Sequence, residues 1–166
     1  MELLDILDDH GNITGSASRE ECHSGSFLLH GVVHVLVFNS DGAVILQKRS
    51  LSKDIEPGKW DTSVGGHINS GETVKDALYR EAGEELGITG AEFEYLYSYT
   101  ITTDIERKFV TAFTCLWPGE ILFQEEEIDE ARPFSPSEVK SLLGTGIFTP
   151  NFEMEWDYYR KWRRKN

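Results

Sequence analysis

The segment from Val64 to Gly87, VGGHINSGETVKDALYREAGEELG, constrains the fold more than any other part of the sequence. It predicts a short strand, WDTSVGGH, that ends around two glycines, followed directly by a helix. Ser70 suits the N-cap position, with Glu72 and Thr73 in the first turn, and Gly87 suits the C-cap position. Apolar residues at i+4 spacing predict the buried stripe of this helix: Val74, Leu78, Ala82 and Leu86. We therefore expect a strand, a loop and a helix in direct succession.

Three carboxylates of this helix, Glu81, Glu84 and Glu85, fall on one helical face. At about 6 Å and an effective dielectric constant near 20, each like-charged pair costs roughly 3 kcal/mol. A solvated, charged helix face is the simplest explanation. The glycines favour a different explanation, a bound divalent cation. Gly83 lies within the helix and Gly65–Gly66 just before it, and glycines allow close backbone approach. Mg²⁺ or Mn²⁺ would turn the repulsion into attraction, and either ion binds diphosphate oxygens.

The remaining pattern predicts one mixed α/β domain over residues 1–166, with a curved, mixed sheet between helices. Alternating apolar residues and turn signals predict its strands and a polar loop, and N-cap residues with apolar periodicity predict two further helices. Ser135, Pro136 and Glu138 have the spacing of a capping box. The expected strands are 2–8, 12–18, 30–39, 43–49, 92–101, 108–117 and 120–123, the loop is 50–59, and the helices are 134–143 and 152–166.

Composition excludes several classes of partner. The formal net charge of −13 argues against binding to nucleic acid polymers or to anionic membranes. The longest apolar run, FLLHGVVHVLVF, has 12 residues and is too short to span a bilayer. The N-terminus lacks the basic and apolar regions of a signal peptide. Two cysteines, Cys22 and Cys115, form no disulfide framework, so we expect a reduced, cytoplasmic setting.

The glycines and charges of residues 66–88 match a longer pattern: Gly66, five residues, Glu72, seven residues, Arg80-Glu81-Ala82, one residue, Glu84-Glu85, one residue, Gly87-Ile88. This pattern resembles a complete Nudix box, with Ala82 where a bulkier aliphatic residue is common. The resemblance implies the Nudix α/β/α sandwich. It also implies divalent-metal-dependent cleavage of a diphosphate linkage in a nucleoside diphosphate derivative, which is a small-molecule substrate.

The resemblance also implies residue roles. Glu81, Glu84 and Glu85 would be metal ligands for Mg²⁺ or Mn²⁺, with the carbonyl of Gly66 as a further ligand. Glu81 or Glu84 would orient or deprotonate the attacking water, and Glu72 and Arg80 would form a structural pair. Some members of the family take the base from a distal loop instead. The acidic run of Glu125, Glu126 and Glu127 is a candidate for that role, or is simply a solvated loop.

The flanking sequence resembles a narrower branch, the isopentenyl diphosphate isomerases and related hydrolases. The similarity lies in SREECHSGSFLLHGVVHVLVFNSDGAVILQKRS and KDIEPGKWDTSVGGHINSGE. It implies a second metal site at His23, His30, His67 and Glu106, for which histidines that only hydrogen-bond within the fold are the alternative. The isomerase cysteine is replaced by Gly65, and Lys108 stands in place of a second glutamate. Both replacements argue against isomerase activity, since allylic proton transfer needs a donor and an acceptor.

Other residues suggest contacts with the substrate. Arg49 and Lys59 are candidate diphosphate-binding residues, although surface cations such as Lys48 and Lys53 usually have no such role. Tyr95, Tyr97 and Tyr99 are expected to share one face of a strand, where they line a pocket or cover a helix. For several other aromatic residues and one histidine, packing is the simpler explanation. We expect to find His34 and Trp60 in the core, and the aromatic residues of the C-terminal segment docked on the domain or on a second subunit: Trp156, Tyr158, Tyr159 and Trp162.

Three functions remain open at this point. A Nudix hydrolase is favoured, an isopentenyl diphosphate isomerase-like enzyme is disfavoured by Gly65 and Lys108, and a non-catalytic nucleotide-binding Nudix module is disfavoured by the complete glutamate set. A homodimer is one alternative for the assembly state. The nucleoside and its linked group are not determined by the box, because selectivity depends on loops and strand faces outside it.

Overall fold

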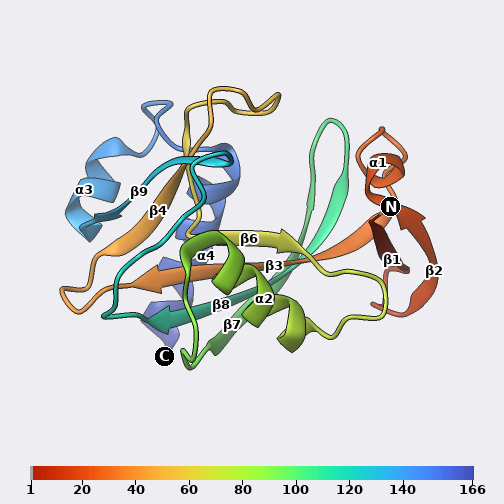
Figure 1. Cartoon of the computed structure of the whole chain (residues 1–166), viewed down its shortest axis with the longest axis horizontal. Helices are drawn as coiled ribbons and strands as arrows, with labels where there is room; N and C mark the ends of the chain where they lie inside the picture. The colour runs from red at the N-terminus through yellow and green to blue at the C-terminus, as the bar shows by residue number, and fades with distance from the viewer. Residues whose placement is uncertain (1) are drawn as a thin grey trace.

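The computed structural model describes residues 2–166, and in that range the chain forms one sheet with helices on both faces (Figure 1). The nine strands are β1 (Leu3–Leu7), β2 (Ile13–Ser18), β3 (Leu29–Phe38), β4 (Val44–Arg49), β5 (Trp60–Asp61), β6 (Val64–His67), β7 (Glu94–Thr102), β8 (Arg107–Leu116) and β9 (Ile128–Phe134). The four helices are α1 (Arg19–Cys22), α2 (Val74–Leu86), α3 (Pro136–Leu142) and α4 (Pro150–Lys165).

Strand β3 organises the sheet, because it pairs with strands on both of its sides. It runs parallel to β8 along its whole length, from the pair Leu29–Arg107 to the pair Phe38–Leu116. Its other neighbours, β1, β6 and β4, are antiparallel to it and follow one another along its opposite edge. The expected mixed sheet is therefore confirmed, and β6 pairs with β3 alone, so the outer edge of β6 has no neighbouring strand.

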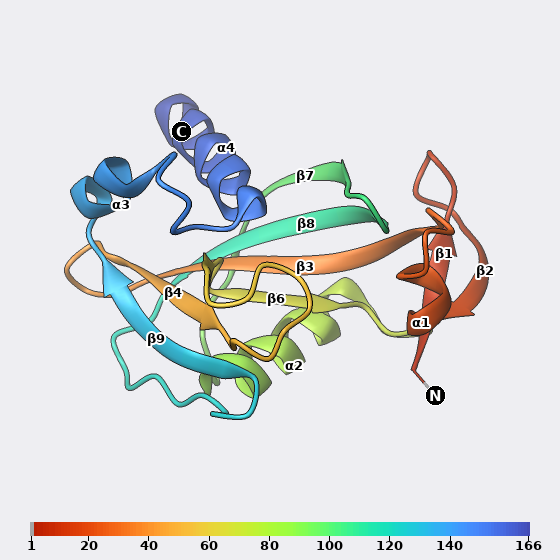
Figure 2. The same cartoon turned by 90° about the horizontal axis from the view of Figure 1, so that it is seen from above.

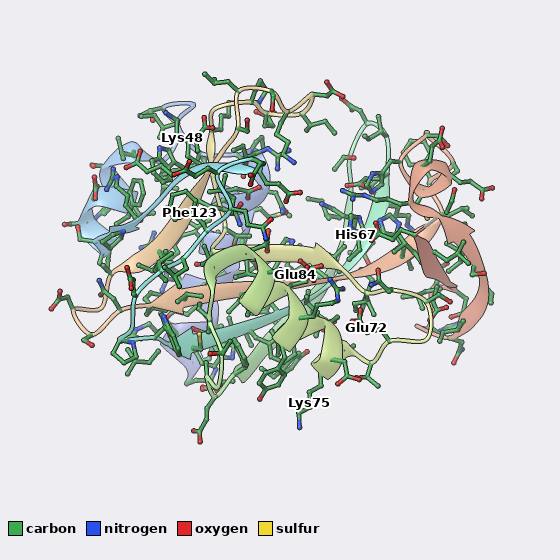
Figure 3. The ribbon with its side chains drawn as sticks, viewed as in Figure 1. Lys48, His67, Glu72, Lys75, Glu84 and Phe123 are labelled. Carbon is green, nitrogen blue, oxygen red and sulfur yellow. The ribbon has the colours of Figure 1, made fainter. Side chains whose placement is uncertain are left out.

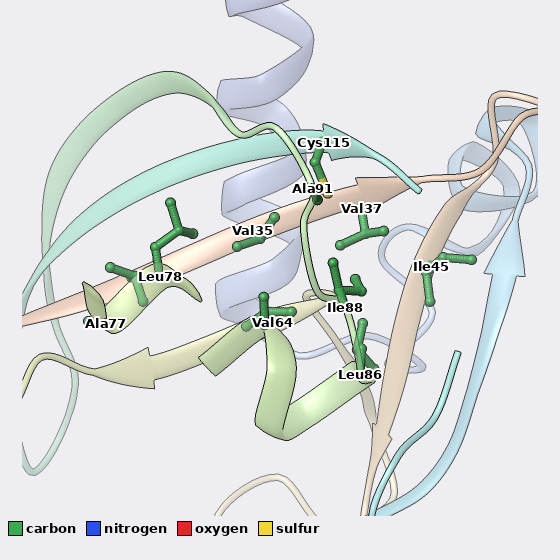
Figure 4. Packing of buried hydrophobic residues seen from close by; sticks show 12 residues of the cluster. Val35, Val37, Ile45, Val64, Ala77, Leu78, Leu86, Ile88, Ala91 and Cys115 are labelled. Atoms are coloured by element: carbon green, nitrogen blue, oxygen red, sulfur yellow. The ribbon is translucent and has the colours of Figure 1, made fainter. Parts of the chain in front are cut away.

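The helices divide the hydrophobic core into two layers. Helix α2 lies against one face of the sheet and α4 against the other (Figure 2). On the α2 side, Val33, Val35 and Val37 of β3 pack with residues of α2, including Leu78 and Leu86 (Figure 4). On the α4 side, the core contains Leu36 of β3 together with aromatic residues, among them Phe134, Phe148, Phe152 and Trp156. The α/β/α arrangement expected from the sequence is confirmed.

Helix α2 begins later than expected. Its N-cap is Thr73, whose hydroxyl accepts a hydrogen bond from the Asp76 amide at 3.0 Å. The expected cap, Ser70, instead donates to Asp5 of β1 at 2.7 Å. Val74 is consequently the first helical residue and is 38% exposed, while Ala77 joins the buried stripe. The C-terminal prediction is confirmed, because Gly87 adopts the left-handed conformation with φ of 68°.

Two other boundaries differ from expectation. The segment WDTSVGGH forms two short strands, β5 and β6, instead of one. Residues 120–123 form no strand, because Ile121 and Phe123 pack on the α2-side core and the Leu122 amide bonds the Leu86 carbonyl at 3.0 Å. The strand in this region is β9, which pairs with β4.

The C-terminal residues form α4, as expected, and they dock on this domain. Thr149 caps the helix by accepting a hydrogen bond from the Phe152 amide at 3.1 Å. Trp156 and Tyr159 are buried against Phe38 at the end of β3. Among residues 2–166, no helix combines the length and the apolar character needed to cross a membrane.

Candidate metal centre

Arg80 of α2 joins the helix to the loop that precedes it. Its guanidinium donates two hydrogen bonds to the Glu72 carboxylate, at 2.8 and 2.9 Å, and one to the His67 carbonyl at 3.0 Å. A further nitrogen donates to Glu81 at 2.7 Å and to Glu84 at 3.3 Å. The bonds from Arg80 lower the pKa of Glu72, and Glu72 in turn raises the pKa of Arg80. The expected Glu72–Arg80 pair is therefore present, and it holds the loop against α2.

Gly66 leaves room for the carboxylate of Glu81. A Cβ atom at position 66 would collide with this carboxylate, so only glycine allows the observed position. Glu81 lies between α2 and β6, and burial raises its pKa, opposed by its hydrogen bond with Arg80. A partly desolvated carboxylate next to a backbone carbonyl is a suitable place for a hard divalent cation, which restores the lost electrostatic stabilisation.

Glu85 reaches the unpaired edge of β6. One carboxylate oxygen accepts the Gly65 amide at 2.9 Å, and the other accepts the side-chain amide of Gln47 at 3.3 Å. Gln47 is itself fixed by donating to the Ser63 carbonyl at 2.9 Å. Burial, and after it the nearby Glu81 carboxylate, raise the pKa of Glu85 to about 8, against the hydrogen bonds from Gly65 and Gln47. Gln47 was not identified from the sequence, where it is one of three polar residues at the end of an ordinary strand.

The three box glutamates lie on the same side of the molecule, but they do not converge on one point. Glu84 is the most exposed of them, at 57% of its side chain, and Arg80 joins it to Glu72 on the loop that follows β6 (Figure 3). Arg80 lies between Glu81 and Glu84, and Glu85 is turned towards Gly65. In this structure the positive charge of Arg80 relieves part of the repulsion among the carboxylates.

A second group of ligand atoms does converge. Atoms of His23, His30, His67 and Glu106 all lie within 4.8 Å of one another, and among residues 2–166 this is the only such group of three or more. The Nε2 atom of His23 is 3.0 Å from that of His67 and 2.8 Å from Glu106 Oε2. Each residue comes from a different part of the chain: the end of α1, β3, the end of β6 and the turn before β8.

The chemistry of this histidine group suits a cation. His30 contacts the Leu28 carbonyl through Nδ1, at 3.0 Å, so its Nε2 is the atom that faces the group. Within residues 2–166, the buried His30 Nε2 forms no hydrogen bond, and neither does the buried Glu106 Oε2, although it lies 2.8 Å from His23 Nε2. Burial, and after it the nearby cationic groups, lower the pKa of His67 to about 2, so this imidazole is neutral. Neutral imidazoles and a carboxylate are metal ligands, and an unpartnered buried polar atom needs an explanation.

Lys108 lies next to this group. Its Nζ atom is 3.3 Å from Glu106 Oε1, the oxygen that does not face the histidines. Lys108 pairs in register with His30 across the parallel strands β3 and β8. Lys108 is thus a cation that holds the Glu106 carboxylate from the side opposite to the histidines.

The expected substrate-binding cations already have partners. Arg49 donates to the Ile55 carbonyl at 2.9 Å and lies 3.6 Å from the Asp61 carboxylate. Lys59 forms an ion pair with Glu56 at 2.7 Å. The acidic residues Glu125–Glu127 are exposed, and no contact joins them to the box within residues 2–166.

Two predictions about aromatic residues have different outcomes. Trp60 is buried in the core, as the interpretation of a packing role predicts. The three tyrosines of β7 do not share one face, because the register shifts between Tyr95 and Tyr97. Tyr95 therefore lies opposite Phe113 and is 54% exposed, whereas Tyr97 packs with Tyr158 of α4.

Comparison with known proteins agrees with this geometry. The model of the NUDIX domain family matches residues 28–152. An uncharacterised Nudix hydrolase of Yersinia pestis is 33% identical over 151 residues, which cover 91% of this chain and 81% of that protein. A crystal structure of a Deinococcus radiodurans protein has a TM-score of 0.77 at 25% identity, covering 89% of this chain and 92% of that one.

A further solved structure shares the fold alone. The NUDIX domain of Shewanella oneidensis NrtR, in complex with ADP ribose, has a TM-score of 0.64 at 16% identity, covering 79% of this chain and 86% of that one. The family model covers most of the chain, and the Yersinia pestis relative aligns over nearly all of it. The box geometry and these similarities together show that this chain belongs to the Nudix hydrolases.

Proposed function

We propose that this protein is a divalent-metal-dependent hydrolase that acts, as a single Nudix domain, on a diphosphate linkage in a nucleoside diphosphate derivative. The observation that best supports the proposal is the pair of partly buried carboxylates, Glu81 and Glu85, at the glycine edge of β6. Glu81 and Glu85 both have raised pKa values because they are buried, and a bound cation would stabilise their charged forms. Mg²⁺ or Mn²⁺ would be held by Glu81, Glu84, Glu85 and the Gly66 carbonyl.

When bound, the metal ion neutralises the charge that develops on the diphosphate as water attacks phosphorus. The residues of the chain have separate tasks in this proposal. Glu81 or Glu84 orients the attacking water or accepts its proton. Arg80 holds Glu81 in place while Glu72 holds Arg80, and Gln47 and the Gly65 amide fix the carboxylate of Glu85.

The substrate is best sought among small nucleoside diphosphate derivatives. The NUDIX domain of NrtR was crystallised with ADP ribose, which makes this compound a reasonable first probe. The proposed diphosphate contacts are Arg49, just before the 50–59 loop, and Lys59, at its end. Each would exchange its present carboxylate partner for a phosphate oxygen. The net charge of −13 disfavours a nucleic acid polymer as the substrate.

The test is hydrolysis of a panel of compounds with Mg²⁺ or Mn²⁺. The panel contains nucleoside diphosphates and triphosphates, dinucleoside polyphosphates, nucleotide sugars, ADP ribose and isopentenyl diphosphate. We expect at least one nucleotide to be cleaved, and Glu85→Gln to lower kcat by about 100-fold or more because it removes a metal ligand. Glu20→Gln, at an exposed position of α1, is the matched control and should leave kcat unchanged. Nucleotide binding without turnover would favour the non-catalytic module.

A second proposed site is the histidine group, which would hold one transition-metal ion through His23, His30, His67 and Glu106. The observation that favours it is the convergence of four ligand atoms within 4.8 Å, two of them buried without a hydrogen bond. Three imidazoles and one carboxylate are compatible with Mn²⁺ or Zn²⁺.

An isomerase-like reaction remains the second candidate function, because it would use this same histidine site. Gly65 supplies no thiol, and Lys108 is engaged with Glu106, so neither candidate proton-transfer group of the isomerases is present. Conversion of isopentenyl diphosphate to an allylic product without release of phosphate would reverse our ranking of the two functions.

We also propose a cytoplasmic protein, in line with two buried cysteines that are both free. A homodimer is the assembly that we would test first, by light scattering of the purified chain. No membrane partner is proposed.

A further inference from the structure

His34 of β3 is held by a carboxylate from the opposite end of the chain. Its Nδ1 atom lies 2.8 Å from Glu155 Oε1, and Glu155, in α4, is completely buried. The other carboxylate oxygen accepts a hydrogen bond from the Tyr97 hydroxyl at 2.7 Å. A buried carboxylate with both oxygens engaged fixes the plane of the imidazole ring and reserves Nδ1 for Glu155.

The second ring nitrogen of His34 has no such partner. Within residues 2–166, Nε2 forms no hydrogen bond. It is also not one of the fully buried polar atoms that lack a hydrogen bond, so it keeps some contact with solvent. His34 as a whole is 95% buried, at 5% exposure, so the little surface that it exposes includes this nitrogen. A carboxylate on Nδ1 and an open Nε2 is an arrangement that presents one nitrogen to a ligand.

The open nitrogen lies beside the box. His34 pairs in register with Gly65 of β6, and a Cβ atom at position 65 would be 3.5 Å from Nε2 and 3.3 Å from the neighbouring ring carbon. The amide of Gly65 is the group that binds Glu85. Gly65, which has no side chain, therefore separates the proposed metal centre on the α2 face of the sheet from His34 on the α4 face.

The edge of β6 connects the two faces. Because β6 pairs with β3 alone, no strand blocks its outer edge. A diphosphate held at Gly66, Glu81 and Glu85 would place its organic substituent along this edge of β6, beside Gly65 and the ring of His34. This inference rests on the proposed function, since it places the substituent relative to the box.

We propose that His34 is a substrate-binding residue, whose Nε2 forms a hydrogen bond with a hydroxyl or amino group on the organic part of the substrate. Glu155 is its positioning residue. His34 would then help to select the group that is linked to the diphosphate, while the box binds the diphosphate itself.

Two substitutions separate the two nitrogens of the ring. In His34→Asn, the side-chain amide can occupy the position of Nδ1 and keep the bond to Glu155, but nothing replaces Nε2. In Gly65→Ala, the ring is intact and a methyl group occupies the space in front of it. We expect both variants to keep the wild-type melting temperature within a few degrees and to raise KM for the best substrate about three- to tenfold, the effect of one hydrogen bond.

A binding measurement makes the test independent of turnover. The ring signal of His34 is identified by NMR as the one that His34→Asn lacks, and it is followed in Glu85→Gln protein, so that a substrate is not consumed. We expect the signal to shift with ADP ribose or another nucleotide of the panel, and not with inorganic pyrophosphate, which has no organic part.

The outcomes are distinct. If no compound shifts the signal, or if pyrophosphate shifts it equally, the inference is wrong, whatever the hydrolysis assay shows. If a nucleotide shifts it but nothing is hydrolysed, His34 remains a ligand-binding residue and the hydrolase proposal fails. An unchanged KM in His34→Asn, with hydrolysis intact, would reject the role of His34 and leave the hydrolase proposal standing.

Discussion

The side chain of Glu81 fills the space that a side chain at position 66 would need. The carboxylate of Glu81 lies where a Cβ atom of residue 66 would be, so the glycine is required by close approach and not by an unusual backbone angle. This relation gives a sharp test of the box geometry, because the smallest possible addition should displace a proposed metal ligand.

We expect Gly66→Ala to lower metal-dependent hydrolysis by about 100-fold, since displacement of a catalytic group by about 1 Å has effects of this size. Gly15→Ala is the matched control, because no atom lies within 4 Å of a Cβ atom there. Rates are measured at saturating Mg²⁺, with circular dichroism to check folding. Wild-type activity in Gly66→Ala would show that the position of Glu81 is not critical.

Arg80 provides a second test at this scale. Arg80→Lys keeps the charge but cannot bind Glu72 through two nitrogens and also reach the His67 carbonyl. We expect the free energy of unfolding, measured with urea, to fall by about 1.5–3 kcal/mol. Arg19→Lys, in a surface ion pair with Glu2 at 3.5 Å, should change it by less than about 0.5 kcal/mol. Equal effects of the two substitutions would contradict a special structural role for Arg80.

At the scale of elements, the structure shows where local sequence signals suffice. Gly87 and the N-cap at Ser135 were predicted correctly, because each acts on residues within one helical turn; the Glu138 carboxylate, however, binds Arg132 instead of closing the capping box. The N-cap of α2 was not, since Ser70 and Thr73 are both good caps and the choice depends on Asp5 in β1, a residue distant in sequence. A local pattern cannot report a competing partner from another strand.

The same limit applies to the last strand. Residues 120–123 have an apolar pattern that predicts a strand, yet Ile121 and Phe123 pack, partly buried, on the α2-side core while Leu122 is exposed. Strand β9 was hidden by its charges and by Pro133, a residue that is tolerated because β9 pairs with β4 alone. Burial decides both cases, and burial depends on the neighbours that the fold supplies.

The cap of α4 joins this helix to β5 and leads to a prediction. The buried hydroxyl of Thr149 accepts from the Phe152 amide and donates to Asp61 at 2.9 Å. We expect Thr149→Ala to lower the free energy of unfolding by about 1–2 kcal/mol, and Ser135→Ala, at the exposed cap of α3, by about 0.5–1 kcal/mol. Urea denaturation of both variants tests the order, and a larger effect at Ser135 would contradict the importance of the Asp61 bond.

At the scale of the whole molecule, the histidine group is assembled by the pairing of distant strands. The spacing of His23 and His30 and the position of His67 were apparent from the sequence, and the structure brings all three together with Glu106. The partners that only tertiary structure could supply are Gln47 and Glu155, which act on Glu85 and His34, residues that lie 38 and 121 positions away in the sequence.

A metal ion in this group should stabilise the whole fold, because its ligands come together only in the folded chain. At a free metal concentration 100 times Kd, the gain is about 2.7 kcal/mol, which raises Tm by roughly 5–10 °C for a domain of this size. We expect Mn²⁺ or Zn²⁺ to give this shift, EDTA to reverse it, and His67→Ala to reduce it strongly.

The control for this experiment is His10→Ala. His10 is exposed in the turn between β1 and β2, so its loss should leave the shift unchanged. Scanning calorimetry with and without metal measures both variants. A shift that is lost in Glu85→Gln but kept in His67→Ala would assign the stabilising ion to the box instead of the histidine group.

The contacts of Arg80 have a further consequence for how the molecule can move. They join β6, the loop after it and α2 through one guanidinium, so these parts cannot separate without breaking several charged bonds at once. The 50–59 loop is different, since the bonds of Arg49 to Ile55 and of Lys59 to Glu56 stay within or next to the loop itself. Residues of this loop can therefore change without disturbing the proposed metal centre, so the two parts of the molecule are free to evolve at different rates.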